Sequence, residues 1–172
     1  KEVEGVTACL PDTYYPGLWG YGSGQASVGD AFGWFVKNCV PESYTQAAQE
    51  KNLSVHQYLT KLASRLAPGE SGLLALDWLG GNRSCLGNPD LSGMILGLTL
   101  QTRPEEIYRA LIEATAYGAR KIIDTFEENG ETKTIPCDAV LLSVGRRANT
   151  AGIGLESMSL RALSDGNRVE VC

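Results

Sequence analysis

A few aspartates and one histidine are the side chains of this sequence that could take part in proton transfer or bind a metal ion. Asp30, Asp77 and Asp90 could each serve as a general base or as a magnesium ligand. They are isolated in the sequence, and lone aspartates at loops and strand ends more often cap the backbone or lie on the surface. His56 is the only histidine and has no cysteine or second histidine nearby, which is typical of a surface or boundary residue. We therefore predict no catalytic residue and no metal ligand in this chain.

The glycine-rich stretch at residues 20–24 and the cysteines are the other features that could carry chemistry. The stretch fits neither the dinucleotide-binding spacing nor the Walker spacing, and no Gly-Lys pair occurs in the chain. We predict that it is a flexible turn. The cysteines number 5, are widely spaced and include no Cys-x-x-Cys pair, a pattern that favours reduced structural thiols over redox or zinc chemistry.

Length, composition and charge limit the class of protein. The 172 residues, 43% hydrophobic and 20% charged, are ordinary for one soluble domain. The net charge of −5 argues against attraction to nucleic-acid phosphates, and no apolar run is long enough to span a bilayer. Residues 1–5 show no secretory pattern. We expect a cytoplasmic protein that binds neither nucleic acid nor a membrane.

The elements that would position these residues alternate between strand and helix in the first part of the chain. Residues 5–10 predict a short strand, followed by an irregular loop with a turn at Pro16 and Gly17. A helix is predicted over residues 25–38, where apolar residues recur at helical spacing, and all three tryptophans are expected to anchor the core and loops. A second helix begins after its capping residue Ser54 and carries an apolar stripe that ends before Pro68.

The next segments predict two buried strands and the longest helix. Residues 72–77 and 93–100 read as the strands, separated by a loop at residues 79–83. Thr102 and Glu105 predict a capping box around Pro104, and Asn129 with Gly130 ends the helix. The apolar face of this helix is expected to consist of Ile107, Leu111, Ala114, Ile122 and Phe126.

After Gly130 the pattern changes to strands. Residues 139–144 form a continuous apolar run, and residues 168–171 alternate between polar and apolar side chains. The sequence therefore predicts an α/β fold with a first part at residues 1–130 and an appended strand-rich tail at residues 131–172.

Several stretches of the first part, in this order, carry a family resemblance. Residues 16–21, 24–36, 74–78, 81–84, 91–93 and 97–116 resemble ribulokinases, which are members of the FGGY carbohydrate kinases. The resemblance implies part of the carboxy-terminal, actin-like (ribonuclease H-like) domain, which in such kinases helps to hold ATP. The parent activity that it implies is phosphorylation of ribulose with ATP and magnesium.

The same resemblance suggests where a nucleotide would lie. The helix predicted from Gln25 would run beside it, and Gly29 and Gly33 would let the backbone approach the phosphates or the ribose. The alternative is that both glycines only permit close helix packing. Gly22 stands where the family usually has a glutamate.

The resemblance covers few of the groups that phosphoryl transfer needs, namely phosphate loops, a magnesium site and a base. The amino-terminal phosphate loop, the sugar site, the catalytic aspartate and the adenosine motif of the family lie outside the matched stretches. We therefore expect a chimeric or truncated kinase domain that binds no cofactor productively alone. Two alternatives remain open: a kinase component completed by a separate amino-terminal partner, and a small acidic protein-binding module such as an inhibitor or antitoxin. An incomplete sheet would also favour self-association.

The tail carries a second resemblance. Residues 137–150 and 154–156 resemble dihydrolipoamide dehydrogenase and related pyridine-nucleotide disulfide reductases, with Ala148 where proline is usual. The resemblance implies that Gly145 corresponds to a glycine near NAD. The tail has no Gly-x-Gly-x-x-Gly fingerprint and no redox-active cysteine pair, so we expect no flavin or NAD chemistry and predict an extra strand or hairpin packed on the first part.

Overall fold

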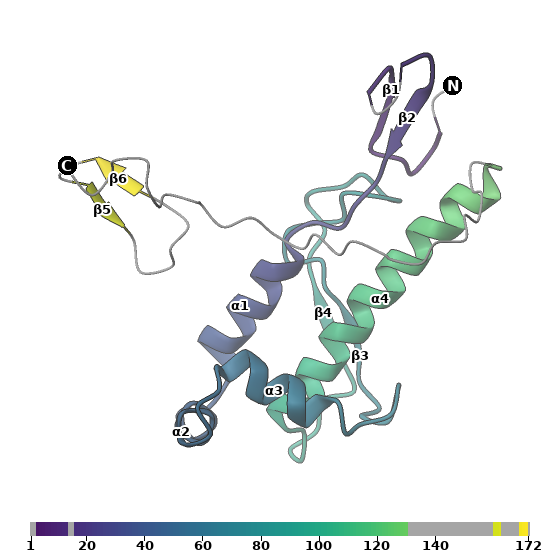
Figure 1. The fold of residues 1–172 in the computed structure, drawn as a ribbon. Coiled ribbons are helices and arrows are strands. Elements are labelled where there is room, and N and C mark those ends of the chain that lie inside the picture. Colours follow the sequence, from purple (N-terminus) through teal and green to yellow (C-terminus); the bar gives the residue numbers. More distant parts are fainter. Residues whose placement is uncertain (1–2, 14–15, 131–159, 163–168, 172) are drawn as a thin grey trace, which may run out of the picture. The chain divides into compact units, whose positions relative to one another are not determined.

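The computed structural model describes residues 3–13, 16–130, 160–162 and 169–171, and it divides the chain into two compact units, Lys1–Lys133 and Thr134–Cys172. Figure 1 shows the elements of both units. The first unit contains the elements β1 (Ala8–Pro11), β2 (Trp19–Gly22), α1 (Val28–Cys39), α2 (Glu42–Glu50), α3 (Val55–Ala63), β3 (Leu74–Leu76), β4 (Met94–Leu96) and α4 (Pro104–Glu128). The second contains β5 (Leu160–Ala162) and β6 (Val169–Val171).

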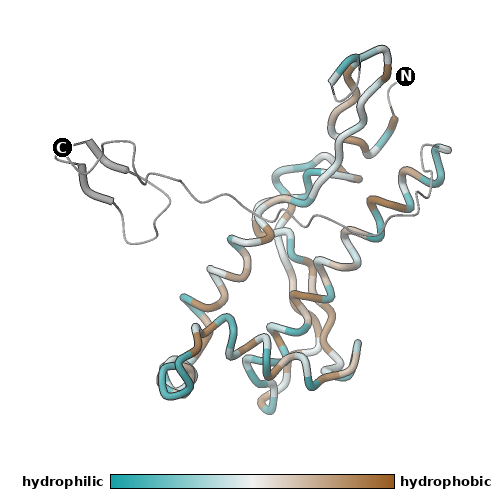
Figure 2. Tube along the Cα trace, viewed as in Figure 1, coloured by the Kyte–Doolittle hydropathy of each residue, from teal (hydrophilic) through white to brown (hydrophobic). Residues whose placement is uncertain are grey.

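Helix α4 is the centre of the first unit, because α1, α3 and β3 all contact it. Its hydrophobic and hydrophilic residues alternate in the manner of an amphipathic helix (Figure 2). Phe35 of α1, Leu59 of α3 and Leu111 of α4 are buried in one cluster. The predicted apolar faces of α1 and α3 and the first half of that of α4 are therefore confirmed as the core, whereas Ile122 and Phe126 stay half-buried. Burying a large apolar side chain stabilises the unit by about 1.5–3 kcal/mol.

The starts of α3 and α4 show how far capping could be predicted. Ser54 caps α3 as expected: its Oγ accepts from Gln57 N at 3.2 Å, and Gln57 Oε1 accepts from Ser54 N at 2.9 Å. The predicted pairing of Thr102 with Glu105 is wrong by one residue, because Arg103 N donates to Glu106 Oε2 at 2.6 Å. The Thr102 hydroxyl instead accepts from Thr99 N at 2.9 Å, which closes the turn before the helix.

Helix α1 begins later than predicted, and α2 is an element that the sequence patterns did not indicate. Ser27 has a left-handed backbone (φ 56°), so the helix begins at Val28 and not at Gln25. The Gln25 side chain is used elsewhere, as a donor to the carbonyl of Thr115 at 2.9 Å. Helix α2 has only Ala48 buried, which explains why it lacks a strong apolar stripe.

The strands of the first unit form two antiparallel pairs, β1 with β2 and β3 with β4. In the second pair Leu74 lies opposite Leu96 and Leu76 opposite Met94, while Ala75 lies opposite Ile95. Ala75 and Ile95 belong to the core side, and the leucine and methionine side chains face away from it. The prediction of fully buried strands is therefore wrong: this small sheet is buried on one face only.

The glycine-rich stretch and the tail differ in how well they agree with the predicted elements. Residues 20–22 lie in β2, so the predicted flexible turn is wrong there, whereas the turn at Gly17 is confirmed (φ 80°). In the second unit β6 agrees with the predicted strand and pairs antiparallel with β5. The predicted strand at residues 139–144 lies outside the described residues.

Candidate functional site

Gly29 and Gly33 lie on the solvent-exposed face of α1. A Cβ atom added at either position would meet no atom within 4 Å. Close helix packing within the described part of the chain therefore does not explain these glycines. Their face of α1 is open to a ligand or to another polypeptide, and the absence of side chains would let either approach the helix backbone closely.

A hollow of about 390 Å³ lies on another side of α1 and is lined by Ser27, Asp30, Ala31, Trp34 and Leu79 but by neither glycine. Asp30 is an exposed residue in the first turn of α1, where a carboxylate favours the helix dipole, so the surface role expected of it is confirmed. The Trp34 side chain is 48% exposed and Trp19 is 54% exposed, so neither is the core anchor that the sequence suggested. An exposed indole beside a hollow can stack on a planar ring.

The loop at residues 80–84 is tied to the chain that leads into α1. Ser84 is buried, and its Oγ accepts from Gly24 N at 2.7 Å and hydrogen-bonds the Thr7 hydroxyl at 2.7 Å. At Gly81 (φ 78°) a Cβ atom would lie 2.6 Å from the backbone of Pro89, so only glycine fits there. These contacts fix the entry to α1 without any side-chain carboxylate at Gly22.

Asp77 is the one candidate aspartate that proves to be buried, with 6% of its surface exposed. The expectation of a cap or surface group is wrong for it, because β3 carries it directly against α4. The Thr115 hydroxyl donates to Asp77 Oδ2 at 3.2 Å. Burial raises the pKa of Asp77, and the hydrogen bond from Thr115 offsets part of that rise. Asp77 thus has a partner on α4 that the sequence could not indicate.

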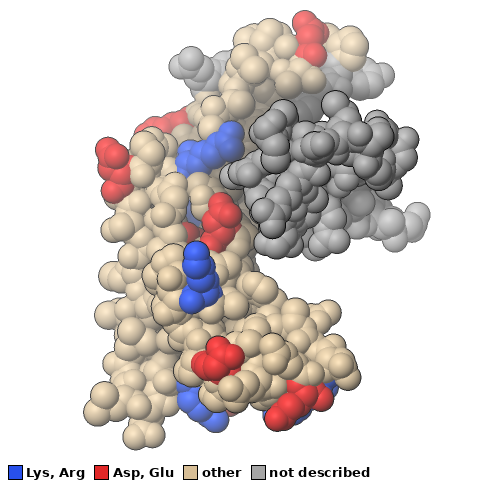
Figure 3. All heavy atoms as spheres, turned by 90° about the vertical axis from the view of Figure 1, so that its left-hand side faces the viewer, with Lys and Arg blue, Asp and Glu red and all other residues tan. Residues whose placement is uncertain are grey.

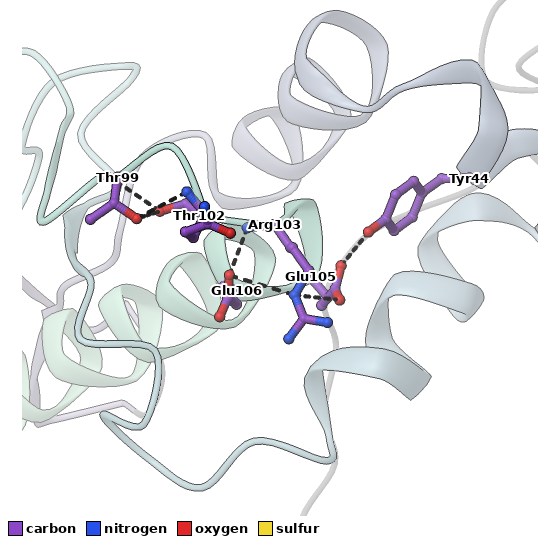
Figure 4. A network of polar contacts seen from close by, with 7 residues as sticks. Tyr44, Thr99, Thr102, Arg103, Glu105 and Glu106 are labelled. Atoms are coloured by element: carbon purple, nitrogen blue, oxygen red, sulfur yellow. Dashed lines mark hydrogen bonds and ion pairs between the residues drawn. The ribbon is translucent and has the colours of Figure 1, made fainter.

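A second polar network joins α2 to the start of α4 (Figure 4). The Tyr44 hydroxyl donates to Glu105 Oε2 at 2.5 Å, and Glu105 is 8% exposed. Burial and this hydrogen bond to a carboxylate raise the pKa of Tyr44. Arg103 Nε lies 3.5 Å from Glu105 Oε1. The network satisfies a buried carboxylate and holds two helices together, which is a structural task.

The remaining candidates lie apart from one another. Asp90 is exposed in a loop, and His56 is exposed, as expected, with its Nδ1 3.1 Å from the Tyr108 hydroxyl. Gly145 lies outside the described residues. Within the described ranges, no group of three His, Cys, Asp or Glu side chains could hold a metal ion.

The charged surface and the length of the helices bear on binding to nucleic acids and membranes. On the face shown in Figure 3, the Lys and Arg side chains that are coloured appear as separate spots among acidic ones. No helix in the described part of the chain is both long enough and apolar enough to cross a bilayer.

Comparison with known proteins places this geometry among sugar kinases. A family model described as "FGGY family of carbohydrate kinases, C-terminal domain" matches residues 1–149. Ribulokinases are similar over 130 residues: the protein from Halalkalibacterium halodurans is 57% identical and that from Geobacillus thermodenitrificans 55%. Each match covers 76% of this chain and 23% of the relative, so the chain spans about a quarter of the length of these relatives. The ribulokinase of Mycolicibacterium smegmatis is 43% identical over 145 residues, 84% of this chain and 25% of that protein.

Two solved structures share the fold. The xylulose kinase of Rhodospirillum rubrum aligns with a TM-score of 0.54 and 28% identity over 68% of this chain and 22% of its own. A ligand-bound xylulose kinase from Lactobacillus acidophilus aligns with a TM-score of 0.55 and 19% identity, over 73% of this chain and 24% of its own. The mixture of helices and strands that the sequence predicted is therefore that of sugar kinases.

Proposed function

The chain belongs to the C-terminal domain family of the FGGY carbohydrate kinases, and from this membership we propose that it supplies a nucleotide-holding part of a ribulokinase. The proposed parent reaction is phosphorylation of ribulose with ATP, in the cytoplasm. Sequence identity of 55–57% to ribulokinases supports the substrate class. The observation that carries the proposal is the open glycine face of α1, with Gly29 and Gly33 exposed and no atom of the described chain above them.

The described residues fit one part of the nucleotide better than the other. A hollow that contains an exposed Trp34 suits a planar base and a ribose. Asp30, Asp77 and Asp90 lie apart, and no group of three acidic, His or Cys side chains occurs within the described ranges. A magnesium ion would therefore take most of its ligands from nucleotide phosphates, from water or from groups outside these ranges. Phosphoryl transfer requires metal, base and phosphate donors at one point, so we infer that this chain alone does not catalyse it.

Titration with ADP, followed by calorimetry, tests the proposal. We expect weak saturable binding to the full chain, and Gly29→Leu should reduce the affinity at least tenfold because its side chain would cover the helix backbone. The matched control is Ala116→Leu on the exposed side of α4, which should leave the affinity unchanged. The chain should form no ADP from ATP, ribulose and magnesium. The proposal would be contradicted if the wild-type chain showed no saturable ADP binding, or if it formed ADP from ATP in the presence of ribulose.

A second candidate is a kinase component that is completed by another polypeptide. The outer face of the β3–β4 pair exposes three large apolar side chains: Leu74 is 51% exposed, Met94 48% and Leu96 58%. Adjacent exposed apolar side chains of this size often mark a surface that another polypeptide covers. The relatives carry about three quarters of their length outside the matched region. We propose that the rest of a ribulokinase chain covers this face.

Mixing the chain with a ribulokinase that lacks the matched residues tests the second candidate. Ribulose-dependent ADP formation should appear on mixing and should be lost with Leu96→Asp, whereas Leu10→Asp on the exposed face of β1 should retain it. If mixing restores neither binding nor turnover, the idea fails. If light scattering shows that the chain self-associates and Leu96→Asp abolishes this, the β3–β4 face is covered by a second copy of the chain and not by the rest of a kinase.

The resemblance of residues 137–150 to disulfide reductases stays a prediction for residues outside the described ranges. The family match extends to residue 149 and so includes Gly145. We propose that this segment has no NAD chemistry of its own, since the chain lacks the Gly-x-Gly-x-x-Gly fingerprint. Titration of the full chain with NADH, followed by its fluorescence, should show no saturable change; saturation that Gly145→Val removes would refute this.

A further inference from the structure

A cavity of about 240 Å³ lies between β3, α4 and the segment that precedes α1. Its walls are mostly apolar and include Leu74, Leu76, Trp78, Ala114 and Tyr117. None of its lining residues belongs to the hollow at Trp34. Because an apolar cavity of about 150 Å³ in another protein holds one benzene molecule, this one has room for a planar molecule of two fused rings.

Asp77 and Gln25, two polar residues that line this cavity, both hydrogen-bond Thr115 of α4, and their oxygens are acceptors. The single hydroxyl hydrogen of Thr115 is shared between Asp77 Oδ2 (3.2 Å) and the carbonyl of Leu111 (3.0 Å), and the Thr115 carbonyl accepts from Gln25 Nε2 (2.9 Å). Gln25 Oε1 is buried without a partner, and within the described ranges it is the one side-chain atom in that situation. A buried acceptor without a partner is destabilising, so a donor from a ligand would be favourable here.

The charge at the cavity favours a neutral ligand. Lys121 also lines it, but its side chain is 58% exposed and its Nζ lies 3.6 Å from Glu128 Oε1. The ammonium group is therefore drawn toward solvent and leaves no cation inside to pair with an anionic ligand. A cationic ligand could pair with the Asp77 carboxylate, but it would lose its hydration against walls that are mostly apolar.

We propose that this cavity is a binding site for a small, neutral, planar aromatic molecule that carries one N–H or O–H donor directed at the Asp77 and Gln25 oxygens. The aromatic body lies between Ala75 of β3 and the α4 residues Ala114 and Tyr117. The site is separate from the proposed nucleotide face and does not depend on it.

Indole is a suitable probe because it has two fused rings and one N–H group. Calorimetric titration of the full chain should show saturable binding with one site. Indene has the same ring shape without the donor, and it should bind about three- to tenfold more weakly, the range expected for one net hydrogen bond. Added ADP should leave the indole affinity unchanged. Absence of saturable indole binding, equal affinity for indene, or competition by ADP would each overturn the proposal.

Cavity-filling variants locate the site. Ala114→Leu should abolish indole binding, whereas Ala116→Leu, the same change on the exposed side of α4, should retain it. If the Ala114 variant does not fold, Ala26→Leu fills the cavity from the segment that precedes α1 and should have the same effect. Indole binding that survives in whichever filled variants fold would show that the ligand lies elsewhere and would overturn the assignment.

Discussion

The two halves of α4 have the same helical backbone but very different surroundings. Residues 104–115 contact the core, and Tyr108, Ala110, Leu111, Glu113 and Ala114 are all buried there. In residues 116–128 the buried residue is Thr125, and the other side chains are exposed or half-buried. Figure 1 shows this second half extending beyond α1 and α3. One helix therefore combines a segment held by core packing with a segment that has fewer contacts to other elements, among them that of Thr125 with Cys85 at 3.5 Å.

This difference shows what an apolar stripe does and does not establish. Leu111 and Ala114 are in the core cluster, whereas Ile122 and Phe126 continue the stripe and stay half-buried. Tyr117 and Ile123 are even more exposed, at 55% and 46%. A helical pattern predicts which face seeks a partner, but only the rest of the fold decides whether a partner is present. The second half of α4 is where additional polypeptide could still pack.

The largest effect is expected from truncating the packed half. Leu111→Ala removes a side chain that is 4% exposed and leaves a cavity among α1, α3 and β3, so it should lower the free energy of unfolding by about 3 kcal/mol. Ile123→Ala in the second half should change it by less than about 0.5 kcal/mol, as for other surface positions. Urea unfolding of both variants checks the contrast, and equal losses would show that the two halves are packed alike.

The next effect concerns a buried ion pair in the packed half. Glu113 is 7% exposed, its Oε1 lies 2.7 Å from Arg109 Nε, and its carboxylate accepts from Gly69 N at 3.1 and 3.2 Å. Glu113→Gln removes the charge and weakens these bonds, so it should lower the free energy of unfolding by about 2 kcal/mol. Chemical unfolding measures this loss, and Gly69 amide exchange should accelerate. Unchanged exchange at Gly69 would contradict the assigned role of Glu113.

The sequence predicted most of the local contacts and missed those that join distant segments. The Ser54 cap of α3 and the apolar faces of α1 and of the first half of α4 follow from residues three or four apart, so periodicity and propensity were enough. The capping box expected at Thr102 and Glu105 was wrong by one residue. The cluster at Asp77 joins residues 38 positions apart, and the Gln25 contact with Thr115 joins residues 90 apart. No local pattern contains that information. The exposed glycines of α1 could be located as candidates, but only the structure showed that no atom of the described residues lies within 4 Å of a Cβ added there.

A smaller effect is expected where β3 meets the packed half. Burial raises the pKa of Asp77 above the value of 3.8 that applies in the unfolded chain. Between these two values the folded protein binds the proton more tightly, so this residue makes stability fall as pH rises from about 3.8 through the folded pKa, and the loss persists at neutral pH. Asp77→Asn cannot ionise and can still accept from Thr115, so it should be more stable than the wild type at neutral pH.

The pH dependence of stability distinguishes an effect of the raised Asp77 pKa from the mere loss of the hydrogen bond between Asp77 and Thr115. Unfolding free energies measured from pH 3 to pH 8, a range of about five units chosen to span the linkage region, should fall less with pH for Asp77→Asn than for the wild type. Thr115→Val is the complementary variant: it removes the hydrogen bond that favours the charged carboxylate, so it should steepen the decline. Parallel curves for Asp77→Asn and the wild type would show that Asp77 does not ionise differently in the folded and unfolded states.

The smallest effect is expected in the second half of α4, where charged pairs lie on the surface. Arg120 Nη2 lies 2.7 Å from Asp124 Oδ1, four residues along the helix, and the arginine side chain is 66% exposed. Because water and salt screen such a pair, Arg120→Gln should lower the free energy of unfolding by only about 0.3–0.5 kcal/mol, and added salt should reduce the difference further. Urea unfolding at low and high ionic strength measures this. A loss as large as that of Glu113→Gln, insensitive to salt, would mean that residues 116–128 are held by packing after all, and that the contrast between the two halves of α4 does not extend to their energetics.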